Sequence, residues 1–361
     1  MASHPSVPLS VLELATVADG SSPAQALTEV TDLARRVEAL GYRRLWVAEH
    51  HGMPAVASSA PAVLIAHLAA ATGTIRVGSG GVMLPNHAPL VIAEQFATLE
   101  ALHPGRIDLG LGRAPGTDPR TAQALRRTAE LDADRFPDDL VELVGYFAGT
   151  IAHPRPVPGA GYRPEIWLLG SSLFSAELAG RLGLPFSFAH HFMPQNTEPA
   201  LARYRAAFRP SAALERPHAM VGAAVVCAPT TDEARYLAGS AALSTVQLRT
   251  GRFGPLPTPE TAAAYRYSLA EQQLVDSTTA SWIVGDPDAV RAGLDDLIAR
   301  TDADELIVTS RVHGYDARAR SFELLAATWG VVPPIGDRGG HRAAGAEVDG
   351  QGQPAGAAAA G

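Results

Sequence analysis

The sequence predicts an α/β fold, specifically a (β/α)8 TIM barrel with an insertion between strands seven and eight. Short apolar runs alternate with segments of helical period, which is the pattern of repeated βα units on a parallel sheet or barrel. Eight such runs occur, a number that favours a closed barrel over an open doubly wound sheet. The chain has 361 residues, 47% of them hydrophobic, so it can bury one large core.

The expected strands and helix ends are read directly from the residues. In chain order the strands are PLSVLEL, RRLWVAE, IRVGSGGVML, RIDLGLG, EIWLLG, FSFAH, AMVGAAVVCA and ELIVTSRV. In the first connecting helix Ser22 can cap, Pro23 suits the first turn, and Gly41 suits a left-handed end residue. The same signals recur at Asp286-Pro287, which begins a helix, and at Gly330, which follows one.

Two segments fall outside the repeat. Residues 239 to about 280 lie between the last two strands and are long enough to form a lid or extra helices. Residues 1–330 are expected to form a single domain. Residues 331–361 are expected to be a disordered tail, because the Gly, Ala and Pro residues from Asp337 onward show no apolar period.

Composition excludes several classes of chemistry. The chain has no lysine, so it cannot build a Schiff-base enzyme, a pyridoxal phosphate site or a Walker P-loop. The single Cys227 rules out an intramolecular disulfide and any multi-thiolate metal site. A net charge of -8 with scattered arginines argues against a nucleic-acid partner. The start, MASHPSVPLS, lacks a secretion signal and no long apolar span follows, so we expect a cytoplasmic protein that does not enter the membrane.

Polar side chains follow the expected strands at the end where barrel enzymes place their active sites. They are Glu49, His50 and His51 after strand two, Asn86 and His87 after three, Arg113 after four, Ser171 and Ser172 after five, and His190 and His191 after six. A buried, hydrogen-bonded imidazole remains the alternative role for the last two histidines.

A metal site is the less favoured interpretation of the two His-His pairs. Adjacent residues on a strand point to opposite faces, so His50 and His51 cannot easily bind one ion while the strand persists. The chain also lacks an HExxH helix and an acidic residue after strand eight, where SRVHG stands. We therefore predict no metal site, with a metal hydrolase kept as a minor alternative.

An arginine and a serine-rich turn suggest a phosphate site instead. LGLGRAPG ends a strand at Arg113, and LLGSSLFSAELAGRLG passes from strand to helix through Ser171, Ser172 and Ser175. Helix N-terminal amides and an arginine fork together bind phosphate. Plain helix capping by Ser171 or Ser172 is the alternative. In GSGGVMLPNHAP the glycines suggest a bulge, or a close backbone approach to something flat.

Four motifs in order resemble the bacterial luciferase-like flavin monooxygenases over about residues 7 to 330. They are AEHH, the small pair before VMLP, PGRIDLGLGR, and the serine-rich turn before AELAGRLGLP. Within the family the chain is most similar to the actinobacterial tailoring oxygenases, the subgroup that includes the mensacarcin-biosynthesis monooxygenase.

The resemblance implies a barrel that binds reduced FMN (FMNH2) supplied by a separate NAD(P)H:flavin reductase. It places a non-prolyl cis peptide at Gly80-Gly81, phosphate contacts at Arg113, Ser172 and Ser175, and a catalytic histidine at His50. Ser171 stands where the luciferase α-chain has a glutamate, so the phosphate geometry departs there. It also implies a homodimer through the second and third helices.

The expected function is a two-component monooxygenase that uses reduced FMN and O2 to hydroxylate or epoxidise a small organic acceptor in secondary metabolism, with His50 managing protons. His50 would face the reaction centre, with Glu49 or His51 turned toward neighbouring structure. Two alternatives stay open: an F420-dependent oxidoreductase on the same barrel, and a noncatalytic luciferase-like subunit.

Overall fold

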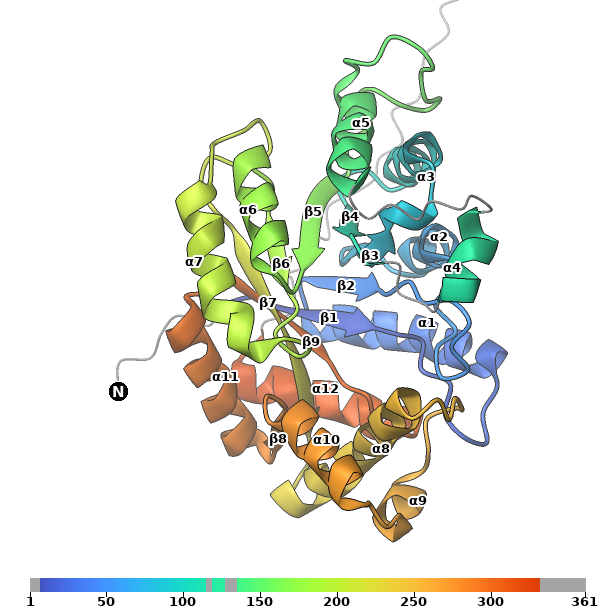
Figure 1. Cartoon of the computed structure of the whole chain (residues 1–361), viewed down its shortest axis with the longest axis vertical. Helices are drawn as coiled ribbons and strands as arrows, with labels where there is room; N and C mark the ends of the chain where they lie inside the picture. Colours follow the sequence, from blue (N-terminus) through green and yellow to red (C-terminus); the bar gives the residue numbers. More distant parts are fainter. Residues whose placement is uncertain (1–6, 115–118, 127–134, 332–361) are drawn as a thin grey trace, which may run out of the picture.

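Eight parallel strands close into a ring in the computed structural model, which describes residues 7–114, 119–126 and 135–331 (Figure 1). The order around the ring is β1-β2-β3-β4-β5-β6-β7-β9, and β9 pairs with β1 to close it. The predicted TIM barrel is therefore confirmed. The ring strands are β1 Leu9–Glu13, β2 Arg44–Val47, β3 Arg76–Met83, β4 Ile107–Gly112, β5 Glu165–Gly170, β6 Phe186–Phe188, β7 Ala219–Cys227 and β9 Glu305–Thr309.

Helices connect the strands and surround the ring (Figure 1). The predicted ends of the first helix are confirmed. The Ser22 hydroxyl accepts a hydrogen bond from the Gln25 amide at its start, and Gly41, with a φ of 91°, adopts the left-handed conformation at its end. Asp286 likewise caps α11, and Gly330 ends α12. The helices are α1 Pro23–Leu40, α2 Pro61–Ala71, α3 Pro89–Leu102, α4 Pro119–Arg126, α5 Phe136–Ala148, α6 Leu173–Leu182, α7 Thr197–Ala207, α8 Thr231–Arg249, α9 Pro259–Ala264, α10 Leu269–Thr279, α11 Pro287–Thr301 and α12 Tyr315–Trp329.

The insertion between β7 and β9 differs in detail from the prediction. Residues 239–249 are not part of it, because α8 continues through them as the regular helix after β7. The added elements are α9, α10 and a ninth strand, β8 (Ile283–Gly285), which lies outside the ring and pairs with β7. Helices α8, α9 and α10 lie together beside the barrel (Figure 1). This group covers one side of the site described below.

A buried charge network closes the N-terminal end of the barrel. The Arg44 side chain, 1% exposed, donates to Asp108 Oδ2 and Glu305 Oε1, each at 2.8 Å. The Trp46 indole also donates to Asp108, at 2.8 Å. Burial raises the pKa of Asp108, although Arg44 and Arg76 oppose it. The charged groups at this end of the barrel are paired with one another. We therefore expect a site at the other end, where the strands have their carboxyl termini.

Two further observations concern the C-terminal residues and the possibility of a membrane-spanning helix. Of the expected tail, residues 331–361, all but Val331 lie outside the described residues, and Val331 packs against the core. In the described part of the chain, no helix is long and apolar enough to cross a membrane.

Candidate functional site

Two adjoining cavities lie at the carboxyl ends of the barrel strands. The large cavity has a volume of about 580 Å³ and the small cavity about 250 Å³. Five residues line both of them, so the two form one continuous site: Leu12, Gly80, Met83, His191 and Phe192.

The small cavity brings together all six residues that the sequence suggested for cofactor binding: Gly80, Gly81, Arg113, Ser171, Ser172 and Ser175. Helix α6 begins there, capped by Ser172, whose hydroxyl accepts a hydrogen bond from the Ser175 amide at 3.4 Å. The capping alternative is therefore correct for Ser172. It does not exclude an anion, because a helix N-terminus has several unpaired amides and a positive dipole end.

Arg113 supplies a positive charge beside this helix end. It lies directly after β4, is partly buried, and its guanidinium carbon is 4.8 Å from the centre of the Phe174 ring. Within the described ranges no carboxylate pairs with it. A partly buried guanidinium without a counter-ion, next to a helix N-terminus, has the donor chemistry of a phosphate site.

The Gly80-Gly81 segment forms the wall between the two cavities. Its peptide bond is cis, and the β3–β4 register shifts between Ser79 and Val82, as a bulge requires. A Cβ on Gly80 would lie 2.6 Å from Leu12, and one on Gly81 would lie 2.8 Å from the Gly110 carbonyl oxygen. The backbone of β4 therefore leaves no room for a side chain at Gly81, and the wall is bare backbone that a flat ring can approach.

His50 lines the large cavity on the other side of Gly80. Its amide donates to the Ser58 carbonyl at 2.9 Å, which fixes the backbone, while its buried Nδ1 has no hydrogen-bond partner among the residues that the structure describes. Burial lowers the pKa of His50, and the charge of Arg311 lowers it further. At neutral pH the ring is thus uncharged and one nitrogen is available as a proton acceptor.

Glu49 and His51 turn away from His50 toward neighbouring structure. The buried Glu49 carboxylate accepts from His51 Nε2 and His87 Nε2, each at 2.8 Å, and from the Met83 amide at 3.0 Å. Burial alone would raise the pKa of Glu49, but these hydrogen bonds lower it overall. The expectation that His50 and His51 point to opposite faces of a strand is wrong. β2 ends at Val47, so both histidines lie in the loop that follows it.

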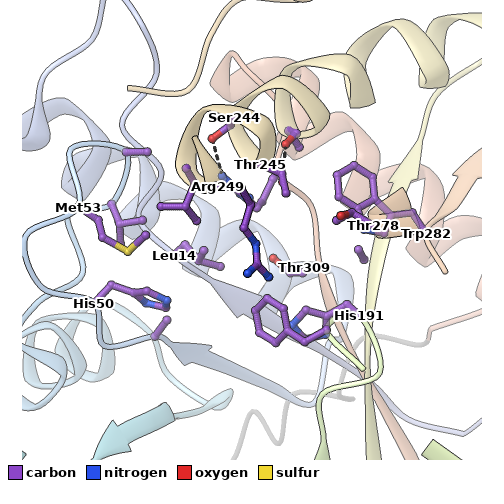
Figure 2. Close-up of a pocket in the computed structure, with 18 of the residues that line it drawn as sticks. Leu14, His50, Met53, His191, Ser244, Thr245, Arg249, Thr278, Trp282 and Thr309 are labelled. Atoms are coloured by element: carbon purple, nitrogen blue, oxygen red, sulfur yellow. Dashed lines mark hydrogen bonds between the residues drawn. The ribbon is translucent and has the colours of Figure 1, made fainter. Parts of the chain in front are cut away.

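The two histidines after β6 have different roles. His190 is buried, its Nδ1 lies 2.8 Å from the Thr197 hydroxyl, and burial lowers its pKa to about 4, so it is a packed core histidine. His191 lines both cavities, and its Nδ1 lies 3.0 Å from the Gly222 carbonyl oxygen. That carbonyl can only accept, so Nδ1 carries the proton and Nε2 is left as an acceptor. Figure 2 shows His50 and His191 bordering one cavity, with Ser244 and Thr245 of α8 across from them.

Sequence reasoning did not name Arg311 and gave His191 no role in this site. His191 was a candidate without an assigned role. Arg311 lies two residues beyond β9 in the SRVHG stretch, which was examined only for an acidic ligand. Its position just after a strand marked it as one of many strand-end residues, but not as an arginine without a carboxylate partner within the described ranges. Among the described residues no group of three or more His, Cys, Asp or Glu side chains is arranged to hold a metal ion.

Comparisons with known proteins agree with this architecture. The sequence model of the luciferase-like monooxygenase family matches residues 7–305. A luciferase-like monooxygenase of Escherichia coli (strain K12) is 50% identical over 320 residues, 88% of this chain and 96% of the relative. The N-acetyl-S-alkylcysteine monooxygenase of Bacillus subtilis (strain 168) is 34% identical over 327 residues, 88% of this chain and 97% of the relative.

A solved structure extends the likeness to three dimensions. The crystal structure of apo-MsnO8 superposes with a TM-score of 0.83 at 39% identity, and the match covers 91% of this chain and 99% of that chain. The predicted family and fold are confirmed. The chain belongs to the luciferase-like monooxygenase family and is an oxidoreductase of that kind.

Proposed function

We propose that this protein is a monooxygenase that uses reduced FMN and O2 to oxygenate a small organic acceptor, by hydroxylation or epoxidation, in secondary metabolism. The observation that carries the proposal is the small cavity, where Arg113, which has no carboxylate partner among the described residues, meets the N-terminus of α6 beside the bare backbone of Gly80-Gly81. These groups suit a ligand with a phosphate at one end and a flat ring at the other.

The residues present fit such a flavin. Arg113 and the amides at the start of α6 would hold its phosphate, Ser171 and Ser175 would border that end, and Gly80-Gly81 would support the ring. Bound reduced flavin supplies the electrons that activate O2. The chain supplies position, a large cavity whose wall is mostly apolar, and the neutral imidazole of His50 on the acceptor side of Gly80.

The partners follow from the same proposal. A flavin held only by noncovalent contacts can arrive reduced from a separate NAD(P)H:flavin reductase. Helices α2 and α3, which lie side by side, expose Val63 (73%), Val91 (46%) and Leu102 (64%), so their outer face suits a second copy of the chain. Sedimentation of the wild type and of Val63→Glu with Val91→Glu tests this homodimer: the wild type should sediment as a dimer and the double variant as a monomer.

An anaerobic titration tests the function. The protein is titrated with reduced FMN and, separately, with reduced F420, and oxygen is then admitted. Tighter binding of reduced FMN, followed by oxygen uptake, supports the proposal. Tighter binding of F420 with no oxygen uptake would identify an F420-dependent oxidoreductase. Binding of neither would leave a noncatalytic subunit.

A further inference from the structure

The large cavity has an unusual charge for this protein. The whole chain carries a net charge of -8, yet none of the described residues that line the large cavity is Asp or Glu. The charged or titratable side chains in its wall are all basic: His50, His191, Arg249, Arg252 and Arg311. The rest of the wall is mostly apolar.

Only one of these arginines lacks both a counter-ion and free access to solvent. Arg252 is paired with Glu271 at 2.8 Å and with the Tyr265 hydroxyl at 2.9 Å, and Arg249 is exposed. Arg311 donates from Nη2 to the Ser244 hydroxyl at 3.1 Å, while its buried Nε has no acceptor. Within residues 7–114, 119–126 and 135–331 no carboxylate pairs with Arg311.

The neighbouring imidazoles cannot neutralise this guanidinium. Burial lowers the pKa of His50 and of His191, and the charge of Arg311 lowers both further, so the two rings are neutral. A buried charge without a partner is costly, and proteins retain one mainly where a ligand will pair with it. An anion entering the large cavity would meet the part of the Arg311 guanidinium that lines it and, next to it, the Ser244 hydroxyl.

We infer that the acceptor oxygenated by this protein is an organic carboxylate, bound through Arg311, with its apolar body against Leu14, Met53 and Trp282. The carboxylate would lie on the β9 side of the large cavity, and the apolar body would extend past His50 toward Gly80. The oxygenated position would then be distant from the carboxylate. This substrate class rests on the proposed function, whereas the anion site itself does not.

The anion could have a second source, the phosphate of the flavin. Two arguments favour the acceptor. Arg113 and the α6 N-terminus already form a phosphate site in the small cavity, and Arg311 lines the large cavity only. The experiment below separates the two sources. If the acceptor supplies the anion, Arg311 binds the carboxylate and Arg113 binds the flavin phosphate. If the flavin supplies it, binding of the flavin phosphate depends on Arg311.

The test is calorimetric titration of the flavin-free protein with octanoate and, as a matched neutral probe, octanamide. The wild type should bind octanoate at least about tenfold more tightly, the scale of one charge-assisted hydrogen bond. Arg311→Met should abolish that preference while octanamide affinity stays within about twofold, which also shows that the variant is folded. Arg311→Lys should retain part of the preference, and Arg113→Met all of it.

A second arm compares oxidised FMN with riboflavin, which lacks the phosphate. Arg113→Met should remove the preference for FMN, and Arg311→Met should leave it unchanged. Equal affinity for octanoate and octanamide in the wild type, or an octanoate preference that survives in Arg311→Met, would overturn the inference. So would an FMN preference that depends on Arg311. Failure of reduced FMN to bind, with the octanoate preference intact, would refute the proposed function and leave the anion site standing.

Discussion

Replacing His50 with alanine should separate flavin binding from chemistry. His50 contributes to the large cavity, and none of the small-cavity contacts at Arg113 and Ser175 depends on it. Its Nδ1 has no partner in the described part of the chain, so replacing the side chain breaks no hydrogen bond to that atom there. We therefore expect His50→Ala to fold and to bind reduced FMN with wild-type affinity.

The expected loss is in product formation. A positioned acid-base group contributes about 100- to 10,000-fold in rate, so product formation should fall by that factor while oxygen is still consumed and released as hydrogen peroxide. The pH dependence follows from the lowered pKa of His50. Because the neutral ring is the proton acceptor, wild-type activity should fall only as the pH drops below the ordinary histidine value of about 6.5.

The assay measures product and peroxide from the same reaction mixture, for His50→Ala and for a matched control, His190→Ala. His190 is also a buried histidine, but it bonds to Thr197 and lines neither cavity, so its replacement should lower stability and leave coupling unchanged. A His50→Ala protein that binds flavin normally and converts oxygen to product at the wild-type rate would refute the reasoning, and His191 would become the next candidate.

Three further predictions concern the scaffold and the conditions. Arg44→Met should lower the free energy of unfolding by roughly 3–5 kcal/mol in urea titrations, because Asp108 and Glu305 would stay buried without the arginine that they share, Asp108 keeping only Arg76; an unchanged value would show that the network is dispensable. The pKa of His190 is about 4 in the folded protein, below its unfolded value of about 6.5, so between these pH values the unfolded state binds more protons. The free energy of unfolding should therefore fall as the pH drops from about 6.5 to about 4, by at most about 1.4 kcal/mol per pH unit. His190→Gln should flatten that slope, and an unaltered slope would assign it elsewhere. Activity should withstand exhaustive chelation, since the described residues form no metal-binding group; a loss restored by zinc or manganese would contradict this.

The barrel was predictable because its ring strands are continuous apolar runs bounded by clear turn and cap residues. Ser22, Gly41 and Asp286 act locally, through bonds within one turn of the chain, so sequence alone reveals them. β8 was missed because three residues carry no period, and it exists only through pairing with β7. A strand of that length is decided by its neighbours.

The site was predictable in part for the same reason. The position of residues at strand ends identified the candidates in the sequence. It could not distinguish the buried role of His190, which packs against α7, from the role of His191, which lines both cavities. Arg311 was invisible for a different reason. Its significance is that no described carboxylate reaches it, and that is a property of tertiary packing around the side chain rather than of any motif.

The central claim is that Arg113 and the N-terminus of α6 hold the phosphate of a reduced flavin. The most direct measurement is an anaerobic titration of wild type, Arg113→Ala and Arg113→Lys with reduced FMN and with reduced riboflavin. The wild type should prefer reduced FMN, and Arg113→Ala should weaken its binding by about 1.5 to 3 kcal/mol without affecting riboflavin. Arg113→Lys should also be impaired, because an ammonium cannot reproduce the bidentate fork. Unchanged affinity of Arg113→Ala for reduced FMN would place the phosphate elsewhere and contradict the account.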